Sequence, residues 1–147
     1  MSSEAEIRAL LDRRADANRA GDAATLVTLL AKDVVAYMLP SPLRFAGAAA
    51  RDEAACRAWF DTWDGPVESV LADPDIRVDG DLAVVHGLCR MRGSKRVEGP
   101  IDLWFRTTLV LQRRAEGWRI VHEHASVPMA MDGSGRAVID LTPENAS

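Results

Sequence analysis

The chain has 147 residues, the length of a single domain. Hydrophobic residues make up 48% and charged residues 27%, which excludes a disordered or collagen-like chain. Eighteen Lys and Arg against 22 Asp and Glu give a net charge of -4, so the balance carries no signature of binding to nucleic acid or to an anionic membrane.

The N-terminus is polar, and no apolar run is long enough for a membrane span or a signal peptide, so we expect a cytoplasmic protein. The two cysteines, Cys56 and Cys89, form no CxxC motif. We therefore expect two buried thiols rather than a disulfide, a zinc finger or a redox motif.

Three helices are expected in the first half of the chain. Ser3 and Glu6 have the spacing of a capping box, and apolar residues then recur at helical spacing until Gly21. Asp22 can cap a second, short helix that extends through Leu30. A strand is expected over 34–39, followed by a third helix over 50–63, whose apolar face carries Cys56, Trp59, Phe60 and Trp63.

The rest of the chain as far as Pro128 has the pattern of strands, at 67–71, 76–78, 82–92, 101–113 and 118–127. Helices followed by an antiparallel meander predict an α+β layout in which the helices pack on one face of a sheet. The segment 129–147 contains Gly133-Ser134-Gly135 and few apolar residues. We expect this C-terminal tail to be mobile or to lie on a partner subunit.

The last hairpin decides which side chains share a face of the sheet. A three-residue loop at 115–117 would pair Arg114 with Trp118, and therefore Leu109 with Glu123. Glu123 then shares one face with the other odd-numbered residues of these strands. The opposite face receives the even-numbered residues, which include Trp104, Trp118, His122 and His124.

Neither face of this hairpin is polar. One face can take the helices, and the other needs separate cover, which a second copy of the chain would supply. We therefore expect a homodimer that buries Trp104, Trp118 and the histidine strand.

The order of the elements, Gly21-Asp22 and the run GWRIVHEHASVP at 117–128 resemble the SnoaL-like branch of the nuclear transport factor 2-like (NTF2-like) superfamily. The resemblance spans about Glu4 to Pro128 and implies one domain over 1–128. It implies a cystatin-like α+β barrel: a highly curved antiparallel sheet wrapped around three helices, with a cone-shaped pocket on the concave face and a homodimer through the convex face. The superfamily has a similar shape in isomerases, polyketide cyclases, dehydratases and subunit-association domains.

The chain departs from the members whose chemistry is understood. The positions that resemble the two acids of ketosteroid isomerases hold Met38 or Leu39, and Leu109. The positions that resemble the pocket arginines of kinase association domains hold Cys89, Leu109 and Ala125. Neither mechanism therefore carries over.

Glu123 is the one carboxylate that the hairpin pairing puts on the concave face, opposite Leu109. Desolvation there would favour the neutral acid, which suits a general acid or base. The alternative is that Glu123 pairs with an arginine such as Arg90 or Arg92.

Two histidines of the last strand, His122 and His124, are the alternative catalytic residues, and His86 lies on an earlier strand. A His-x-His pair with a third histidine could bind a metal. On the face that carries the tryptophans, these rings are more typical of an interface. We expect no metal and no cofactor.

The pocket residues share an expected position on the concave face or on the helix that covers it. They predict a small hydrophobic or aromatic ligand. The substrate-binding set is Tyr37, Met38, Trp59, Trp63, Cys89, Met91, Phe105, Thr107 and Leu109.

Three functions are compatible with this pattern. The first is a cofactor-independent isomerase, cyclase or dehydratase that uses Glu123 on a small apolar or aromatic substrate. The alternative is a non-catalytic dimeric module for ligand binding or association. The third, a metal enzyme built on the histidines, has the least support.

Overall fold

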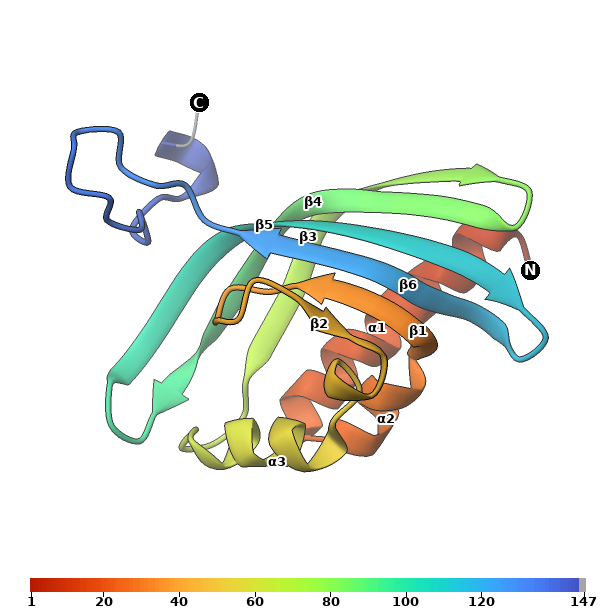
Figure 1. Cartoon of the computed structure of the whole chain (residues 1–147), viewed down its shortest axis with the longest axis horizontal. Helices are drawn as coiled ribbons and strands as arrows, with labels where there is room; N and C mark the ends of the chain where they lie inside the picture. The colour runs from red at the N-terminus through yellow and green to blue at the C-terminus, as the bar shows by residue number, and fades with distance from the viewer. Residues whose placement is uncertain (146–147) are drawn as a thin grey trace.

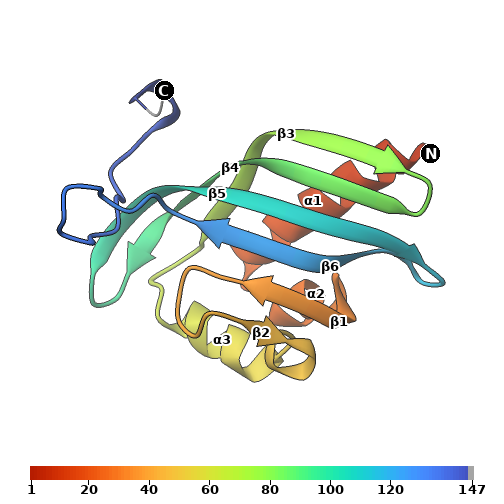
Figure 2. The ribbon, with the colours of Figure 1, turned by 45° about the horizontal axis from the view of Figure 1, so that its top comes forward.

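A computed structural model describes residues 1–145 of the chain as a six-stranded sheet that curves over three α-helices (Figure 1). The helices are α1 (Ser3–Ala20), α2 (Ala23–Thr28) and α3 (Glu53–Asp61). All three lie on the concave side, and α1 runs under the long strands while α3 lies at one end (Figure 2). The α+β fold is therefore confirmed.

Caps define the helix boundaries. The N-cap of α1 is Ser2, one residue before the Ser3 of the predicted capping box, and its hydroxyl oxygen accepts a hydrogen bond from the Ala5 N–H. The helix ends at Gly21, which has a left-handed φ of 66°. Asp22 caps α2 through the Thr25 N–H, as predicted. The α2 helix stops at Thr28, not at Leu30, which instead begins the first strand and pairs with Ile120.

The sheet has the strand order β2-β1-β6-β5-β4-β3. Its strands are β1 (Leu30–Tyr37), β2 (Phe45–Ala46), β3 (Glu68–Asp79), β4 (Leu82–Lys95), β5 (Gly99–Arg114) and β6 (Gly117–Ser126). A 3₁₀ turn at Gly47–Ala49 follows β2. The prediction of a purely antiparallel sheet is wrong, because β6 inserts between β1 and β5 and runs parallel to β1.

The two short strands predicted at 67–71 and 76–78 are one strand, β3, with an irregularity between Ala72 and Asp75. Pro74 has no N–H to donate to the ladder, and Asp73 has a left-handed φ of 43°. A bulge therefore separates the two halves of β3 without ending the strand.

The β5–β6 hairpin corrects the predicted facing of Trp118. Arg114 pairs with Gly117 across a two-residue turn, and Arg113 pairs with Trp118. A shift between Val110 and Leu111 leaves Val121 as an extra residue of β6, so that Leu109 still pairs with Glu123. On β6, Trp118, Ile120 and Glu123 consequently all face the helices.

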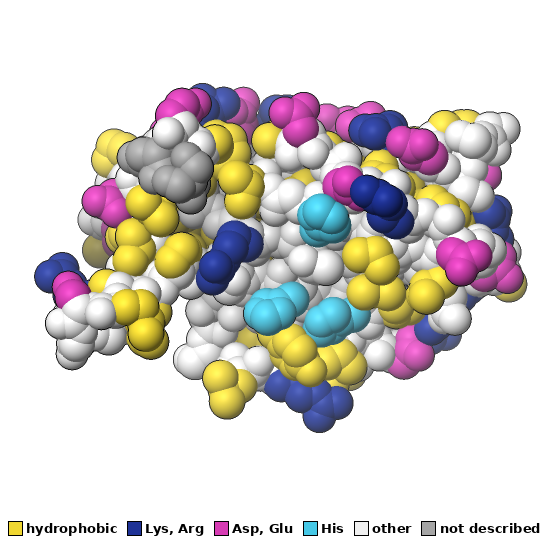
Figure 3. Space-filling view, turned by 90° about the horizontal axis from the view of Figure 1, so that it is seen from above, with side chains coloured by type: hydrophobic (Ala, Val, Ile, Leu, Met, Phe, Trp, Pro, Cys, Tyr) yellow, Lys and Arg dark blue, Asp and Glu magenta, His cyan; other side chains and the backbone are white. Residues whose placement is uncertain are grey.

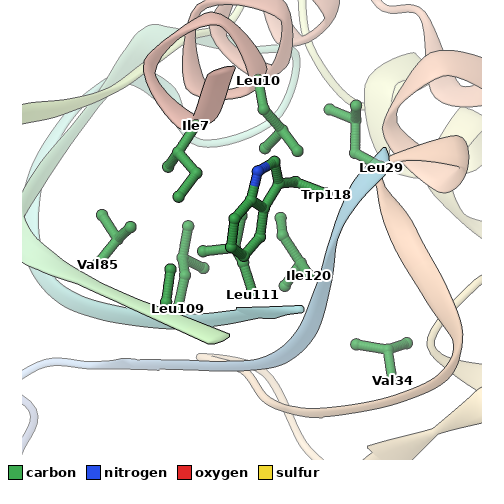
Figure 4. Packing of buried hydrophobic residues seen from close by; sticks show 10 residues of the cluster. Ile7, Leu10, Leu29, Val34, Val85, Leu109, Leu111, Trp118 and Ile120 are labelled. Atoms are coloured by element: carbon green, nitrogen blue, oxygen red, sulfur yellow. The ribbon is translucent and has the colours of Figure 1, made fainter. Parts of the chain in front are cut away.

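Trp118 is therefore a residue of the intramolecular core and not of the convex face. Its ring is 4% exposed and packs with Ile7 and Leu10 of α1 and with Leu111 and Ile120 of the sheet (Figure 4). The same cluster continues to Leu29, Val34, Ala83, Val85 and Leu109. This core fills the wide part of the concave face beneath α1.

The convex face carries the histidines, together with hydrophobic and basic side chains (Figure 3). The Tyr37 ring packs edge-on against His122 and His124, with ring centroids 4.8 and 5.5 Å apart. Arg90 lies over the Trp104 ring at 5.4 Å. The helices α1, α2 and α3 lie on the opposite side of the sheet (Figure 1), and Glu144 of the C-terminal 3₁₀ turn lies in electrostatic range of Arg90 on this face.

The segment after β6 leaves the end of the sheet and turns back on itself (Figure 1). Ala130 donates to the Arg136 carbonyl and Val138 to the Pro128 carbonyl, and a 3₁₀ turn follows at Pro143–Asn145. Residues 146 and 147 of the predicted tail lie outside the described residues. Among the helices that the structure describes, none is long and apolar enough to cross a membrane.

Trp118→Ala should lower the free energy of unfolding by about 3–5 kcal/mol, because it empties a filled core. Since the ring packs inside one chain, the loss should be the same at low and at high protein concentration in urea unfolding. Leu82→Ala, at a side chain 48% exposed, is the control and should change little. If the free energy of unfolding lost in Trp118→Ala grew with protein concentration, Trp118 would instead belong to the predicted dimer interface.

Candidate functional site

The concave face holds a buried ion pair between α1 and β6. Glu123, 6% exposed, accepts a hydrogen bond on Oε1 from Nη2 of Arg14, whose side chain is 25% exposed. Burial opposes the charged form of Arg14, but the charge and the hydrogen bond of Glu123 raise its pKa above the ordinary value. Glu123 is therefore a carboxylate with a fixed cationic partner, and the partner is neither Arg90 nor Arg92.

Those two arginines have other partners, on the convex face. Arg90 forms a two-pronged pair with Asp102, and Arg92 pairs with Glu68. The alternative in which an arginine neutralises Glu123 is thus favoured by the geometry, with the arginine supplied by a helix instead of a strand.

Three polar side chains form an arc across neighbouring strands beneath Arg14. Thr107 on β5 pairs with Gly87 of β4 and with Ala125 of β6, so Cys89 and Glu123 are its diagonal neighbours on either side. Both Cys89 and Glu123 lie within electrostatic range of Arg14. The arc Cys89, Thr107 and Glu123 therefore lies under one guanidinium.

Thr107 is the unusual member of the arc. The residue is 6% exposed, and its buried Oγ1 has no hydrogen-bond partner among the described residues. A buried hydroxyl without a partner costs about 1–3 kcal/mol. Such an atom next to a charged pair indicates a place where something else is bound.

Cys89 is a neutral thiol in this arc. Burial raises its pKa above the ordinary value, and the Ser69 hydroxyl, 3.5 Å from its sulfur, and the Arg14 charge oppose that shift only in part. Cys56 is half-buried and also free. Neither thiol has the low pKa that a nucleophilic cysteine needs.

The α3 helix and the residue Trp63 just after it supply an aromatic cluster at the end of the concave face. Trp59 packs edge-on against Phe60 and Trp63, with ring centroids 5.1 and 5.4 Å apart. Trp63 is 2% exposed and covers Gly93 of β4 so closely that a Cβ there would lie 2.9 Å from its ring. Met91 and Phe105, both half-buried, lie on the same face of the sheet between Gly93 and the arc.

Two of the predicted pocket residues are placed elsewhere. Tyr37 lies on the convex face against the histidines, because β1 turns Val34 and Ala36 inward instead. Leu109 is fully buried in the core under α1 and lines no open surface. Met38 is half-buried just after β1.

The histidines do not share the site with Glu123. His122 donates from Nδ1 to the Val35 carbonyl at 2.7 Å, which orients the ring within the convex face. His124 is exposed beside Tyr37, and His86 lies 3.7 Å from Asp75. Within residues 1–145, no three His, Cys, Asp or Glu side chains come together as a metal site.

Two surface hollows lie away from the arc. One, of about 270 Å³, lies between α1 and α2, and another, of about 240 Å³, lies on the convex face beside Trp104. Neither is lined by Glu123 or by Thr107. The site is instead defined by the polar arc, by Arg14 and by the aromatic cluster.

Sequence reasoning missed Arg14, although a signal was present. Arg14 continues the apolar stripe of α1, seven residues after Ile7 and four after Leu10. A charged residue in such a stripe faces the core and needs a buried partner of opposite charge.

Comparison with solved structures identifies the fold. An NTF2-like protein of unknown function from Pseudomonas putida is 30% identical, with 97% of this chain and 99% of that chain covered and a TM-score of 0.81. An NTF2-like protein from Salmonella enterica is 21% identical, with 91% and 97% covered and a TM-score of 0.74. The CaMKII hub of S. rosetta is 23% identical, with 82% and 93% covered and a TM-score of 0.63.

The family follows from the sequence itself. The model of the SnoaL-like domain matches residues 7–130. The chain therefore belongs to the SnoaL-like family, within the NTF2-like superfamily. No curated protein matches it in sequence.

Arg14→Met should destabilise the protein by about 3 kcal/mol, because it leaves the Glu123 carboxylate buried without a partner. The double variant Arg14→Met with Glu123→Gln removes both charges, and its free energy of unfolding should lie within about 1 kcal/mol of the wild type.

The control for this pair is Arg114→Met, which breaks the more exposed pair with Asp33 and should cost less than about 1 kcal/mol. Urea unfolding of the four proteins provides the measurement. Equal losses for Arg14→Met and the double variant would contradict the buried pair.

Proposed function

We propose that the protein binds a small, weakly polar or aromatic molecule on the concave face and is of the isomerase, cyclase or dehydratase type, with Glu123 as the proton-transferring group. The observation that carries the proposal is the arc together with Arg14: a buried carboxylate, an unpartnered hydroxyl on Thr107 and a partly exposed guanidinium. Membership of the SnoaL-like family supports the ligand class.

The chemistry requires no cofactor. Glu123 would take a proton from a carbon or hydroxyl of the ligand and return it at another atom, and its second oxygen accepts no hydrogen bond among the described residues. Arg14 would stabilise the carboxylate in one orientation and leave its remaining N–H groups for an oxygen on the ligand.

The second candidate is a non-catalytic ligand-binding or association module. Arg14 favours it, because the hydrogen bond from Arg14 already occupies one oxygen of the Glu123 carboxylate inside the chain. A structural neighbour supports it too, since the S. rosetta protein is a hub.

A flat activated probe separates the two candidates. A base removes the ring C–H proton of 5-nitrobenzisoxazole, the N–O bond breaks, and a coloured cyanophenolate forms. If Glu123 acts as a base, the wild type should accelerate this reaction, and Glu123→Gln should lose about 10²-fold or more of the rate. Absorbance of the product measures it.

Asp33→Asn is the matched control, because Asp33 is an arginine-paired carboxylate outside the concave face. It should react like the wild type. Equal rates for wild type and Glu123→Gln, with retained binding of the probe, would reject the catalytic function in favour of the binding module.

We also propose a homodimer through the convex face. The support is a face that none of α1, α2 and α3 covers and that carries Trp104, Tyr37 and the histidines, with Tyr37 39% exposed. The proposed interface does not include Trp118, which lies in the core of the chain.

Val110→Glu would place a charge between Val84 and His122 in the middle of this face. It should shift sedimentation from dimer to monomer, because an unpaired charge is costly in an interface. Gln112→Glu, exposed near the hairpin end of β5, is the control and should remain dimeric. A monomeric wild type at micromolar concentration would contradict the proposal.

A further inference from the structure

Arg14 has more hydrogen-bonding capacity than the described residues use. A guanidinium has five N–H donors in a rigid fork, and in this protein one of them bonds to Glu123. The others have no acceptor among residues 1–145, and the side chain as a whole is 25% exposed to solvent.

The groups around the unused N–H donors of Arg14 determine which ligand charge is favoured there. The groups in electrostatic range of Arg14 are Glu123, which it already binds, and Cys89, whose thiol is neutral. The Thr107 hydroxyl, on the diagonal neighbour of Glu123 across β5 and β6, is buried and has no partner in the described chain. The Arg14 guanidinium and the Thr107 hydroxyl can each donate a hydrogen bond. A ligand group with two acceptor oxygens could accept from both.

The body of the ligand would lie along the same face. Phe105 and Met91 continue from the arc towards the indoles of Trp59 and Trp63 at the end of the face. These side chains are apolar or aromatic, so they favour a flat hydrocarbon body over a sugar or a nucleotide.

We infer that the ligand is an aromatic or apolar carboxylate, whose carboxylate binds the free edge of Arg14 and the hydroxyl of Thr107 and whose body lies on Phe105 and Met91. The inference rests on the proposed binding site and names its ligand class. It does not require Glu123 to be catalytic.

Charge balance gives the inference a distinctive signature. Arg14 and Glu123 together are neutral, so a bound carboxylate makes the site negative and competes with Glu123 for the same guanidinium. Removing the negative charge of Glu123 should therefore strengthen binding of an anion, whereas it would leave binding of a neutral ligand unchanged.

The test uses 2-naphthoate and its neutral analogue 2-naphthamide in isothermal titration calorimetry with the full chain. The wild type should bind the carboxylate at least about tenfold more tightly than the amide, the effect of one charge-assisted hydrogen bond. Glu123→Gln should bind the carboxylate about fivefold more tightly than the wild type, and the amide equally.

The double variant Arg14→Met with Glu123→Gln keeps the pair neutral and should bind the two probes alike. Thr107→Val removes the unpartnered hydroxyl without changing the shape, so it should unfold at a higher urea concentration and yet bind the carboxylate several-fold more weakly. Arg13→Met, which removes the same charge from the neighbouring exposed position of α1, should leave both affinities unchanged.

Equal binding of carboxylate and amide by the wild type would overturn the inference and leave the proposed binding of small aromatic molecules standing. The inference would also be overturned if Arg13→Met bound the carboxylate as weakly as the double variant does. The attraction would then come from the overall positive charge of α1 and not from Arg14. Binding of neither probe would reject the inference and the proposed concave site together.

Discussion

The extra residue of β6 at Val121 is the constraint on which the rest of the structure depends. In a regular strand, side chains alternate between faces, so Trp118 and Glu123 would point in opposite directions. The bulge breaks the alternation once, and β6 can then place Trp118 and Ile120 in the core and Glu123 over the concave site. One strand thus provides both the packing that stabilises α1 and the carboxylate that α1 binds.

The pairing of Arg14 with Glu123 changes what the carboxylate can do. An unpaired acid in hydrocarbon would have no partner to fix its orientation, whereas the Arg14 guanidinium holds Glu123 by a hydrogen bond. The energetic cost of burying both groups is offset only if the remaining donors and acceptors are satisfied. The unfilled positions are the remaining donors of Arg14 and the hydroxyl of Thr107, and Thr107 lies on the side of Glu123 towards Phe105 and the aromatic cluster.

Much of the fold could be predicted from the sequence, because caps, helical spacing and strand alternation are local. The pairing of Leu109 with Glu123 was predicted correctly through two errors that cancel: the turn is one residue shorter than expected, and the bulge adds one residue back. The facing of Trp118, which lies between the two errors, was therefore wrong. Tyr37 was misplaced because 34–39 is a continuous apolar run, from which the inward positions cannot be read. The partner of Glu123 depends on the rotation of α1 against the sheet, which is a tertiary property.

The parallel pairing of β1 with β6 also determines the order in which the molecule can be assembled. Leu30 and Tyr37 pair in the ladder with Ile120 and His124, which lie 90 and 87 residues further along the chain. During synthesis, α1, α2 and β1 emerge long before β6, so their apolar residues are not yet buried against it. Contacts this distant in sequence are slow to form, because a long loop must close before any of them contributes. The first third of the nascent chain therefore exposes these apolar residues to association with other chains until residues 117–126 have left the ribosome.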